Sequence, residues 1–108
     1  MNIDNNIRID RDLEPLVAGF MERRLAEIPI MEQLYSEKNF EEFKKLGHKL
    51  KGSCLNYGFG SLGQLAAQME QAAGDQNEAE LRNLIDTIKN HVNNVKITYI
   101  DPETETGL

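Results

Sequence analysis

The chain has 108 residues, of which 40% are hydrophobic and 28% charged, and its formal net charge is -6. This length suits one domain with a single modest core, and the composition is that of a folded domain rather than a disordered chain. The negative charge argues against a general nucleic-acid binder, because such proteins bind phosphate backbones through clustered lysine and arginine. We therefore expect one folded domain that does not bind nucleic acid.

The sequence also carries information about the cellular compartment. No apolar stretch approaches the roughly 20 residues that a membrane span requires, and the N-terminus lacks the basic and apolar regions of a signal peptide. The one cysteine, Cys54, cannot form an internal disulfide, which fits a reducing compartment. These features predict a cytoplasmic protein that does not associate with membranes.

The first third of the chain has a helical pattern. After an N-terminal segment of residues 1–9, Asp10 or Asp12 can cap a helix. Pro29 must kink this helix or begin a new one at residues 29–37, because proline lacks the amide proton that a helix interior uses. The expected fold therefore includes an additional short N-terminal helical segment. The apolar residues expected on the first helix are Leu13, Leu16, Val17, Phe20, Met21 and Leu25.

Three further helices are marked by capping signals, each a polar residue followed three positions later by Glu or Gln. They predict helices over residues 40–57, 61–74 and 77–95. Gly74 is expected to end the second of these in a left-handed conformation. The capping pairs are Asn39 with Glu42, Ser61 with Gln64, and Asn77 with Glu80. The apolar residues at helical spacing on the last helix are Leu81, Leu84, Ile85, Ile88, Val92 and Val95.

No strand-like alternation is apparent before Val95, and residues 96–108 are expected to be an extended or frayed tail. The stretch 95–100 is short and has no obvious pairing partner, so it is expected to lie extended against the domain. Amphipathic helices joined by short loops favour an antiparallel bundle. The sequence thus predicts an all-α fold, an antiparallel four-helix bundle over residues 10–95.

The second predicted helix carries an unusual polar face. Its apolar stripe is formed by Phe43, Leu46, Leu50, Cys54 and Tyr57. At about 100° per residue, His48 lies roughly 150° from the centre of that stripe. The same rotation places Lys44, Lys51, Gly52 and Leu55 around His48. A glycine in a helix costs roughly 1 kcal/mol relative to alanine, so Gly52 suggests that a partner approaches this face closely.

The region around His48 is also locally basic. Residues 40–52 contain four lysines and two glutamates, a net +2 in a chain of net charge -6, and these lysines include Lys44 and Lys45. Such a basic patch suits the docking of an acidic pocket, although lysines also commonly solvate the outer face of a helix.

Several conventional sites are missing from the sequence. It has no phosphate-binding glycine motif and no paired Cys or His at metal-ligand spacing, so we expect neither ATP binding nor a metal site. Cys54 falls on the apolar stripe and is expected to act as a small core residue. His91 is expected to be structural or neutral, and Phe59 to close the end of the bundle in the turn Gly58-Phe59-Gly60.

The motif around His48 resembles the histidine-containing phosphotransfer (HPt) domain family, and the resemblance extends from about Asp10 to Val95. Met69 stands where a leucine is more usual, a change that alters little, and Cys54 and Leu55 occupy positions where small residues are common. The matching residues are F-K-K-L-G-H-K-L-K-G-S at 43–53, Y-G-F at 57–59, Leu62, Leu65 and Met69-Glu70.

This resemblance implies a phosphoryl carrier rather than an enzyme. His48 would accept the phosphoryl group, Lys51 would offset its charge, and Glu70 would face the histidine and hold its ring. Gly52 would leave room for a receiver domain, which would supply the acidic pocket and Mg²⁺. The binding surface is expected to include Lys44, Lys45, Gly52, Leu55 and Phe59.

The expected partners are response-regulator receiver domains, with a hybrid histidine kinase as a further candidate, and the protein is expected to be monomeric. Met1 and the tapering tail favour a free-standing protein, although a domain cut from a longer kinase would look the same. Two alternatives remain open from the sequence. One is a helical adaptor that binds a receiver or kinase without being phosphorylated, and the other is a bundle unrelated to signalling.

Overall fold

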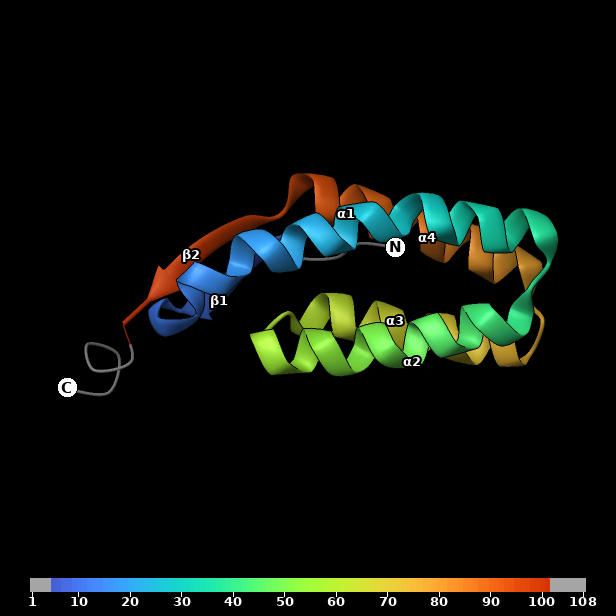
Figure 1. Cartoon of the computed structure of the whole chain (residues 1–108), viewed down its shortest axis with the longest axis horizontal. Coiled ribbons are helices and arrows are strands. Elements are labelled where there is room, and N and C mark those ends of the chain that lie inside the picture. The colour runs from blue at the N-terminus through green and yellow to red at the C-terminus, as the bar shows by residue number, and fades with distance from the viewer. Residues whose placement is uncertain (1–4, 102–108) are drawn as a thin grey trace.

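The computed structural model describes residues 5–101 and contains four α-helices and two short strands in that range. The helices run up and down as a bundle, with α2 and α3 forming one layer and α1 and α4 the other (Figure 1). The sequence prediction of a helical bundle is therefore confirmed. The helices are α1, Glu14–Glu37; α2, Phe40–Tyr57; α3, Gly60–Gly74; and α4, Glu78–Asn94.

Two of the predicted capping signals start helices as expected. The Asn39 side chain accepts a hydrogen bond from the backbone N–H of Glu42 at 3.3 Å, and Asn77 does the same for Glu80 at 3.1 Å. These bonds satisfy amide groups that the helix itself leaves unpaired. Gly58 ends α2 at φ 81°, a left-handed conformation that glycine adopts without steric cost.

Helix α3 differs from its prediction in how it begins and in the conformation of its last residue. It begins at Gly60, and the residue before it, Phe59, makes no side-chain cap hydrogen bond, so Ser61 is not a cap. The helix ends at Gly74 as expected, but Gly74 is not left-handed. Gln76 instead takes the positive φ of 55° in the turn.

The first helix is continuous. Pro29 lies inside α1 on an exposed position, so of the two expected alternatives, a kink or a new helix at residues 29–37, the new helix is wrong. The Asp10 side chain caps a short 3₁₀ turn, Arg11–Leu13, by accepting from the backbone N–H of Asp12 at 2.9 Å. Leu16 and Leu25, expected among the apolar residues of this helix, are exposed.

The ends of the described chain form a structure that the sequence prediction missed. Strand β1, Asn6–Asp10, pairs in parallel with β2, Lys96–Ile100, and Ile7 lies opposite Ile97. The segment before α1 is therefore a strand rather than a helix, and residues 96–100 do have a pairing partner. Ile7 and Ile9 are buried in the common core, so the strands belong to the same fold as the bundle. Residues 102–108 of the predicted tail lie outside the described part.

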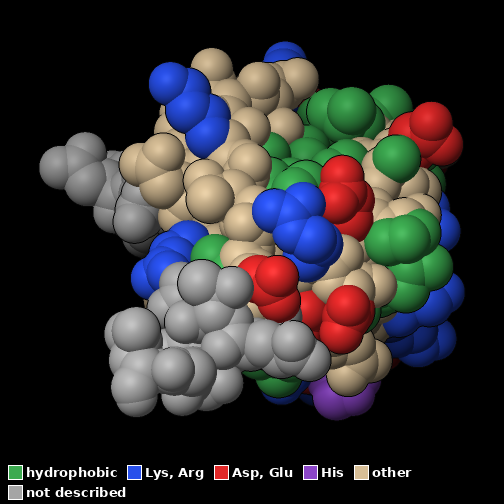
Figure 2. Space-filling model, turned by 90° about the vertical axis from the view of Figure 1, so that its left-hand side faces the viewer, with side chains coloured by type: hydrophobic (Ala, Val, Ile, Leu, Met, Phe, Trp, Pro, Cys, Tyr) green, Lys and Arg blue, Asp and Glu red, His purple; other side chains and the backbone are tan. Residues whose placement is uncertain are grey.

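A single hydrophobic core fills the space between the two helix layers. On α2 the core includes Phe43, Leu50 and Cys54, while Leu46 and Tyr57 are partly buried against it. On the surface, hydrophobic side chains are interspersed with charged ones of both signs at the end of the molecule shown in Figure 2. Among residues 5–101, the large hydrophobic residues that remain exposed are Leu16, Leu25, Ile30 and Leu55.

Candidate functional site

Helix α2 presents His48 on its solvent side, as the helical rotation predicts. The His48 side chain is 71% exposed, and Leu55, two turns further along, is 65% exposed. Gly52 lies between them on the same face, and a Cβ atom added to it would have nothing within 4 Å. The fold itself therefore does not require a glycine at position 52, because a side chain there would not collide with another helix.

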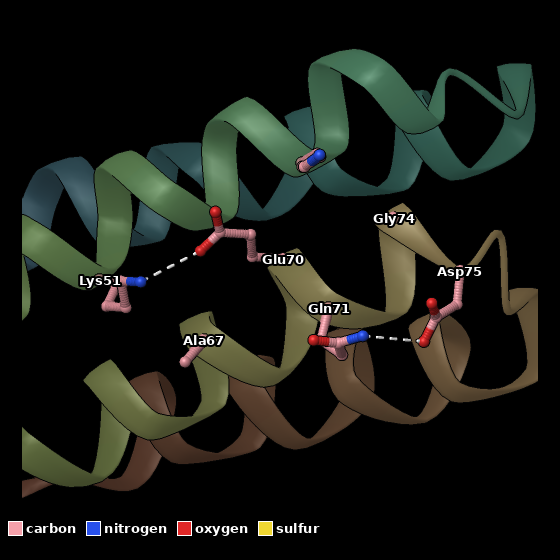
Figure 3. Close-up of a pocket in the computed structure, with 7 residues that line it drawn as sticks. Lys51, Ala67, Glu70, Gln71, Gly74 and Asp75 are labelled. Atoms are coloured by element: carbon pink, nitrogen blue, oxygen red, sulfur yellow. Dashed lines mark hydrogen bonds and ion pairs between the residues drawn. The ribbon is translucent and has the colours of Figure 1, made fainter.

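Glu70 on α3 joins this face by bridging two side chains of α2. Its Oε2 lies 3.2 Å from Nδ1 of His48, and its Oε1 accepts a hydrogen bond from Nζ of Lys51 at 3.2 Å. Figure 3 shows Lys51 reaching from α2 to Glu70 on the neighbouring helix. The structure thus brings together three residues that are up to 22 positions apart in the sequence.

The charge state of Glu70 follows from these contacts. The hydrogen bond from Lys51 lowers the pKa of the Glu70 carboxyl below its ordinary value of 4.5, and the contact with His48 lowers it further. Burial acts in the opposite direction but does not outweigh them. Glu70 is therefore a carboxylate at neutral pH, and a carboxylate only accepts hydrogen bonds.

This carboxylate determines which nitrogen of a neutral His48 carries the proton. Because Glu70 cannot donate, Nδ1 of His48 must be the protonated nitrogen, and the lone pair lies on Nε2. No residue between 5 and 101 forms a hydrogen bond with Nε2. The arrangement is that of an exposed imidazole nucleophile held from behind by a carboxylate.

The other predicted binding residues fall into two groups. Lys44 and Lys45 are exposed, and together with Glu41, His48 and Glu70 they line a shallow depression beside the imidazole. Lys45 pairs with Glu42 at 3.3 Å, an exposed contact that is worth little. A second depression, between α2 and α3, is lined by Lys44, Lys51, Ala67, Glu70, Gln71, Gly74 and Asp75 (Figure 3).

Phe59 does not belong to the exposed surface. It is 1% exposed and stacks on Phe20 of α1 with ring centroids 4.3 Å apart. Its prediction as a binding residue is therefore wrong, because the turn after α2 folds its ring into the core. It does close the end of the bundle, as the sequence also indicated.

Two residues with reactive side chains lie in the interior. Burial raises the pKa of the Cys54 thiol to about 12, which leaves it protonated and unreactive at neutral pH. His91 is 1% exposed and its Nδ1 lies 2.8 Å from Oδ1 of Asn5, where it connects α4 to the segment leading into β1.

Gly47 is a part of the site that the sequence does not single out. It is buried where α2 crosses α3, and a Cβ atom there would lie 2.9 Å from the backbone nitrogen of Glu70. The helical rotation places Gly47 on the apolar stripe and Gly52 on the opposite face beside His48, but only the tertiary contact reveals how closely α3 approaches Gly47. The signal that was available is a second glycine within one helix, directly before the histidine.

Two further kinds of site are absent from the described part of the chain. Residues 5–101 contain no group of three or more His, Cys, Asp or Glu side chains that could hold a metal ion. None of the helices in this range has the length and hydropathy needed to cross a membrane.

Comparison with known families identifies the class of protein. Residues 15–97 match the family model of the Hpt domain, which covers most of the 108-residue chain. The chain therefore belongs to the Hpt domain family. No curated protein and no solved structure gave a significant match. Hpt domains are phosphocarriers rather than catalytic enzymes, and they interact with receiver domains in two-component phosphorelays.

Proposed function

We propose that this protein is a histidine phosphocarrier in a multistep phosphorelay and that His48 is the residue that carries the phosphoryl group. The observation that carries this proposal is the contact of Nδ1 of His48 with the Glu70 carboxylate, which leaves Nε2 exposed with its lone pair. A neutral imidazole has an unshared electron pair on its unprotonated nitrogen, with which it can act as a nucleophile.

The transfer step is a displacement at phosphorus. Nε2 of His48 attacks the phosphorus of an aspartyl phosphate on the receiver, an N–P bond forms, and the P–O bond to the aspartate breaks. The aspartate carboxylate leaves with the electron pair of that bond. The proton on Nδ1 stays in place, and the Glu70 carboxylate stabilises the positive charge that develops on the ring. The reverse displacement returns the group to an aspartate.

Lys51 and the receiver supply the remaining charge compensation. Lys51 is one helical turn from His48, and we propose that its ammonium group, held at Glu70 in this structure, turns toward a phosphoryl group on Nε2. The phosphoryl group carries negative charge that is distributed over its oxygens, so transfer depends on positioning and charge neutralisation. We expect the receiver domain to bring the Mg²⁺, and the phosphocarrier to need no cofactor of its own.

The surface around His48 suits a receiver domain. Lys44 and Lys45 provide positive charge opposite the acidic pocket of a receiver. Gly52 leaves open space and Leu55 offers an exposed apolar side chain on the same face. We propose that these residues contact the receiver, that the protein acts as a monomer in the cytoplasm, and that a hybrid histidine kinase can supply the receiver.

Incubation with a radioactively phosphorylated receiver domain tests this function. We expect label on the protein that is labile in acid and stable in base, as phosphohistidine is, and none on His48→Gln. The second histidine, His91, is buried and provides the control variant His91→Gln, provided that it folds. Label that persists in His48→Gln would refute the site assignment. A protein that binds receivers but takes label from none would be the helical adaptor instead.

A further inference from the structure

Gly47 lies beside the site, at a position where the backbones of α2 and α3 pack closely together. A Cβ atom at this position would lie 2.9 Å from the backbone nitrogen of Glu70, 3.1 Å from its Cα and 3.1 Å from the carbonyl oxygen of Ala66. All three neighbours are backbone atoms of α3, so no side chain could rotate away to relieve the contact. Any residue other than glycine would therefore push the two helices apart.

The segment of α3 that Gly47 contacts is the one that carries Glu70. Glu70 reaches His48 and Lys51 through contacts of 3.2 Å each, which are at the long end for hydrogen bonds of a carboxylate. A retreat of the α3 backbone by even a few tenths of an ångström would lengthen both contacts beyond a normal hydrogen bond.

We propose that Gly47 is a positioning residue for phosphoryl transfer: its missing side chain lets α3 approach α2 closely enough for Glu70 to hold Nδ1 of His48. The proposal concerns the orientation of the imidazole, and its consequence for transfer rests on the proposed function. The two glycines near His48 then have different structural roles. Gly47 lets a neighbouring helix of the same chain come close, whereas Gly52 faces open space where a partner can approach.

Gly63 provides a matched control within the same pair of helices. It is buried on α3, and a Cβ atom there would lie 3.4 Å from Cβ of Cys54 and 3.8 Å from Cδ2 of Leu55, which is nearly ordinary van der Waals contact. Gly63→Ala thus adds the same methyl group to the same interface but away from Glu70. A general effect of crowding α2 against α3 would appear in both variants, and loss of the Glu70 contact only in Gly47→Ala.

The experiment first measures the site without any partner. In protein labelled with ¹⁵N-histidine, NMR reports which ring nitrogen of His48 is protonated, and ¹³C NMR follows the titration of the Glu70 carboxyl. For Gly47→Ala we expect a mixture of imidazole tautomers and a pKa of Glu70 closer to its ordinary value. Gly63→Ala should match the wild type in both measurements. A Gly47→Ala protein that folds and keeps the wild-type tautomer would overturn the proposal.

The rate of phosphorylation is then measured with phosphoramidate, a small donor whose P–N bond breaks as the N–P bond to His48 forms and ammonia leaves. We expect Gly47→Ala to react about fivefold more slowly, the equivalent of roughly one hydrogen bond. The double variant Gly47→Ala/Glu70→Gln should be no slower than Glu70→Gln alone, because both changes remove the same contact. Additive losses in the double variant would contradict the proposal.

Two further outcomes keep this inference separate from the proposed function. If wild-type His48 takes no phosphoryl group from phosphoramidate or from any receiver, the proposed function fails, while the NMR comparison still decides the role of Gly47.

If Gly47→Ala does not fold, Glu70→Asp replaces it, because the shorter side chain withdraws the carboxylate without crowding the helices. An unchanged tautomer and rate in Glu70→Asp would overturn the proposal.

Discussion

The two layers of the bundle are built by different means. In the α2–α3 layer, small residues let the helices approach closely, and Gly47, Gly63 and Ala66 lie at or near the contact. The buried residues of α1 and α4 instead include no glycine or alanine, and they are larger side chains such as Phe20 and Ile85.

The α1–α4 layer also contains the polar and strand contacts that tie the ends of the fold together. Arg82 of α4 donates to Glu32 of α1 at 2.7 Å, and β1 pairs with β2 beyond the ends of these helices. By contrast, the contacts between α2 and α3 at Glu70 are exposed or half-buried and converge on His48. The α1–α4 layer thus holds an ion pair and strand contacts that lie away from the site, while the α2–α3 layer presents His48 and the residues that contact it.

The largest expected effect tests the packing of α1 onto the turn between α2 and α3. Phe20 is fully buried and stacks on Phe59, so Phe20→Ala should lower the free energy of unfolding by about 3–5 kcal/mol. Urea denaturation measures this loss. Phosphoramidate should still label the folded fraction at the wild-type rate. A large loss of rate per folded molecule would show that packing at Phe20 also affects the site on α2 and α3.

The second prediction concerns the open space at Gly52. Gly52→Gln should slow transfer from a phosphorylated receiver by about tenfold or more, because the reacting atoms must come within about 3–3.5 Å. Labelling by the small donor phosphoramidate should change little, since no receiver has to dock. Ala26→Gln, at an exposed position of α1, is the control. An unchanged receiver rate in Gly52→Gln would mean that the glycine does not clear space for a partner.

Removing the positive charge of Lys51 should have a somewhat smaller effect on the rate of phosphoryl transfer. Lys51→Ala removes the ammonium group next to His48 and should slow transfer about fivefold, with little change in the melting temperature. Stopped-flow or quenched-flow measurement of receiver dephosphorylation gives the rate. Lys89→Ala, at an exposed position of α4, removes the same charge from the other layer and should have no effect. Equal rates for the two variants would remove Lys51 from the transfer step.

Glycine at position 52 should also lower the stability of α2. Gly52→Ala is expected to raise the free energy of unfolding by roughly 0.5–1 kcal/mol, because alanine has the higher helix propensity and its Cβ meets no other atom. Thermal melting followed by circular dichroism detects this gain. A destabilised variant would show that position 52 packs against the fold.

The smallest expected effect is a pH dependence of stability that arises from Glu70. Its folded-state pKa is lowered, so its ionised contacts stabilise the fold above the ordinary pKa of 4.5, and this contribution is lost as the pH falls through the folded-state value. Wild type should therefore be slightly more stable than Glu70→Gln at pH 7, and the difference should vanish in acid. Urea denaturation from pH 7 to 3 measures it. A constant difference would contradict the assignment.

The helices could be predicted from the sequence because their signals are local. Asn39 and Asn77 cap helices through residues three positions away, and the apolar spacing of α4 gives its buried face directly. The strand pair could not be predicted in this way, because β1 and β2 lie at opposite ends of the chain. Even so, the alternation of polar residues with Ile7 and Ile9 is a strand signal that was present.

The site was predictable to a similar extent. Periodicity places His48 on the solvent face of α2, and the exposure of its side chain agrees. Glu70 was indicated only by the family resemblance, since nothing local connects α3 to His48. Periodicity also places Gly52 beside His48, but the close approach of α3 to Gly47 and the burial of Phe59 depend on how α2 packs against α3 and α1. Such tertiary contacts leave no periodic signal in the sequence.

The most direct test of the proposed function is to identify the atom that carries the phosphoryl group. Protein labelled with ¹⁵N-histidine is phosphorylated by a receiver domain, and NMR then detects the coupling between phosphorus and a ring nitrogen. We expect coupling to Nε2 of His48, with Nδ1 still protonated and facing Glu70. Coupling to Nδ1, or phosphorus on any residue other than His48, would contradict it.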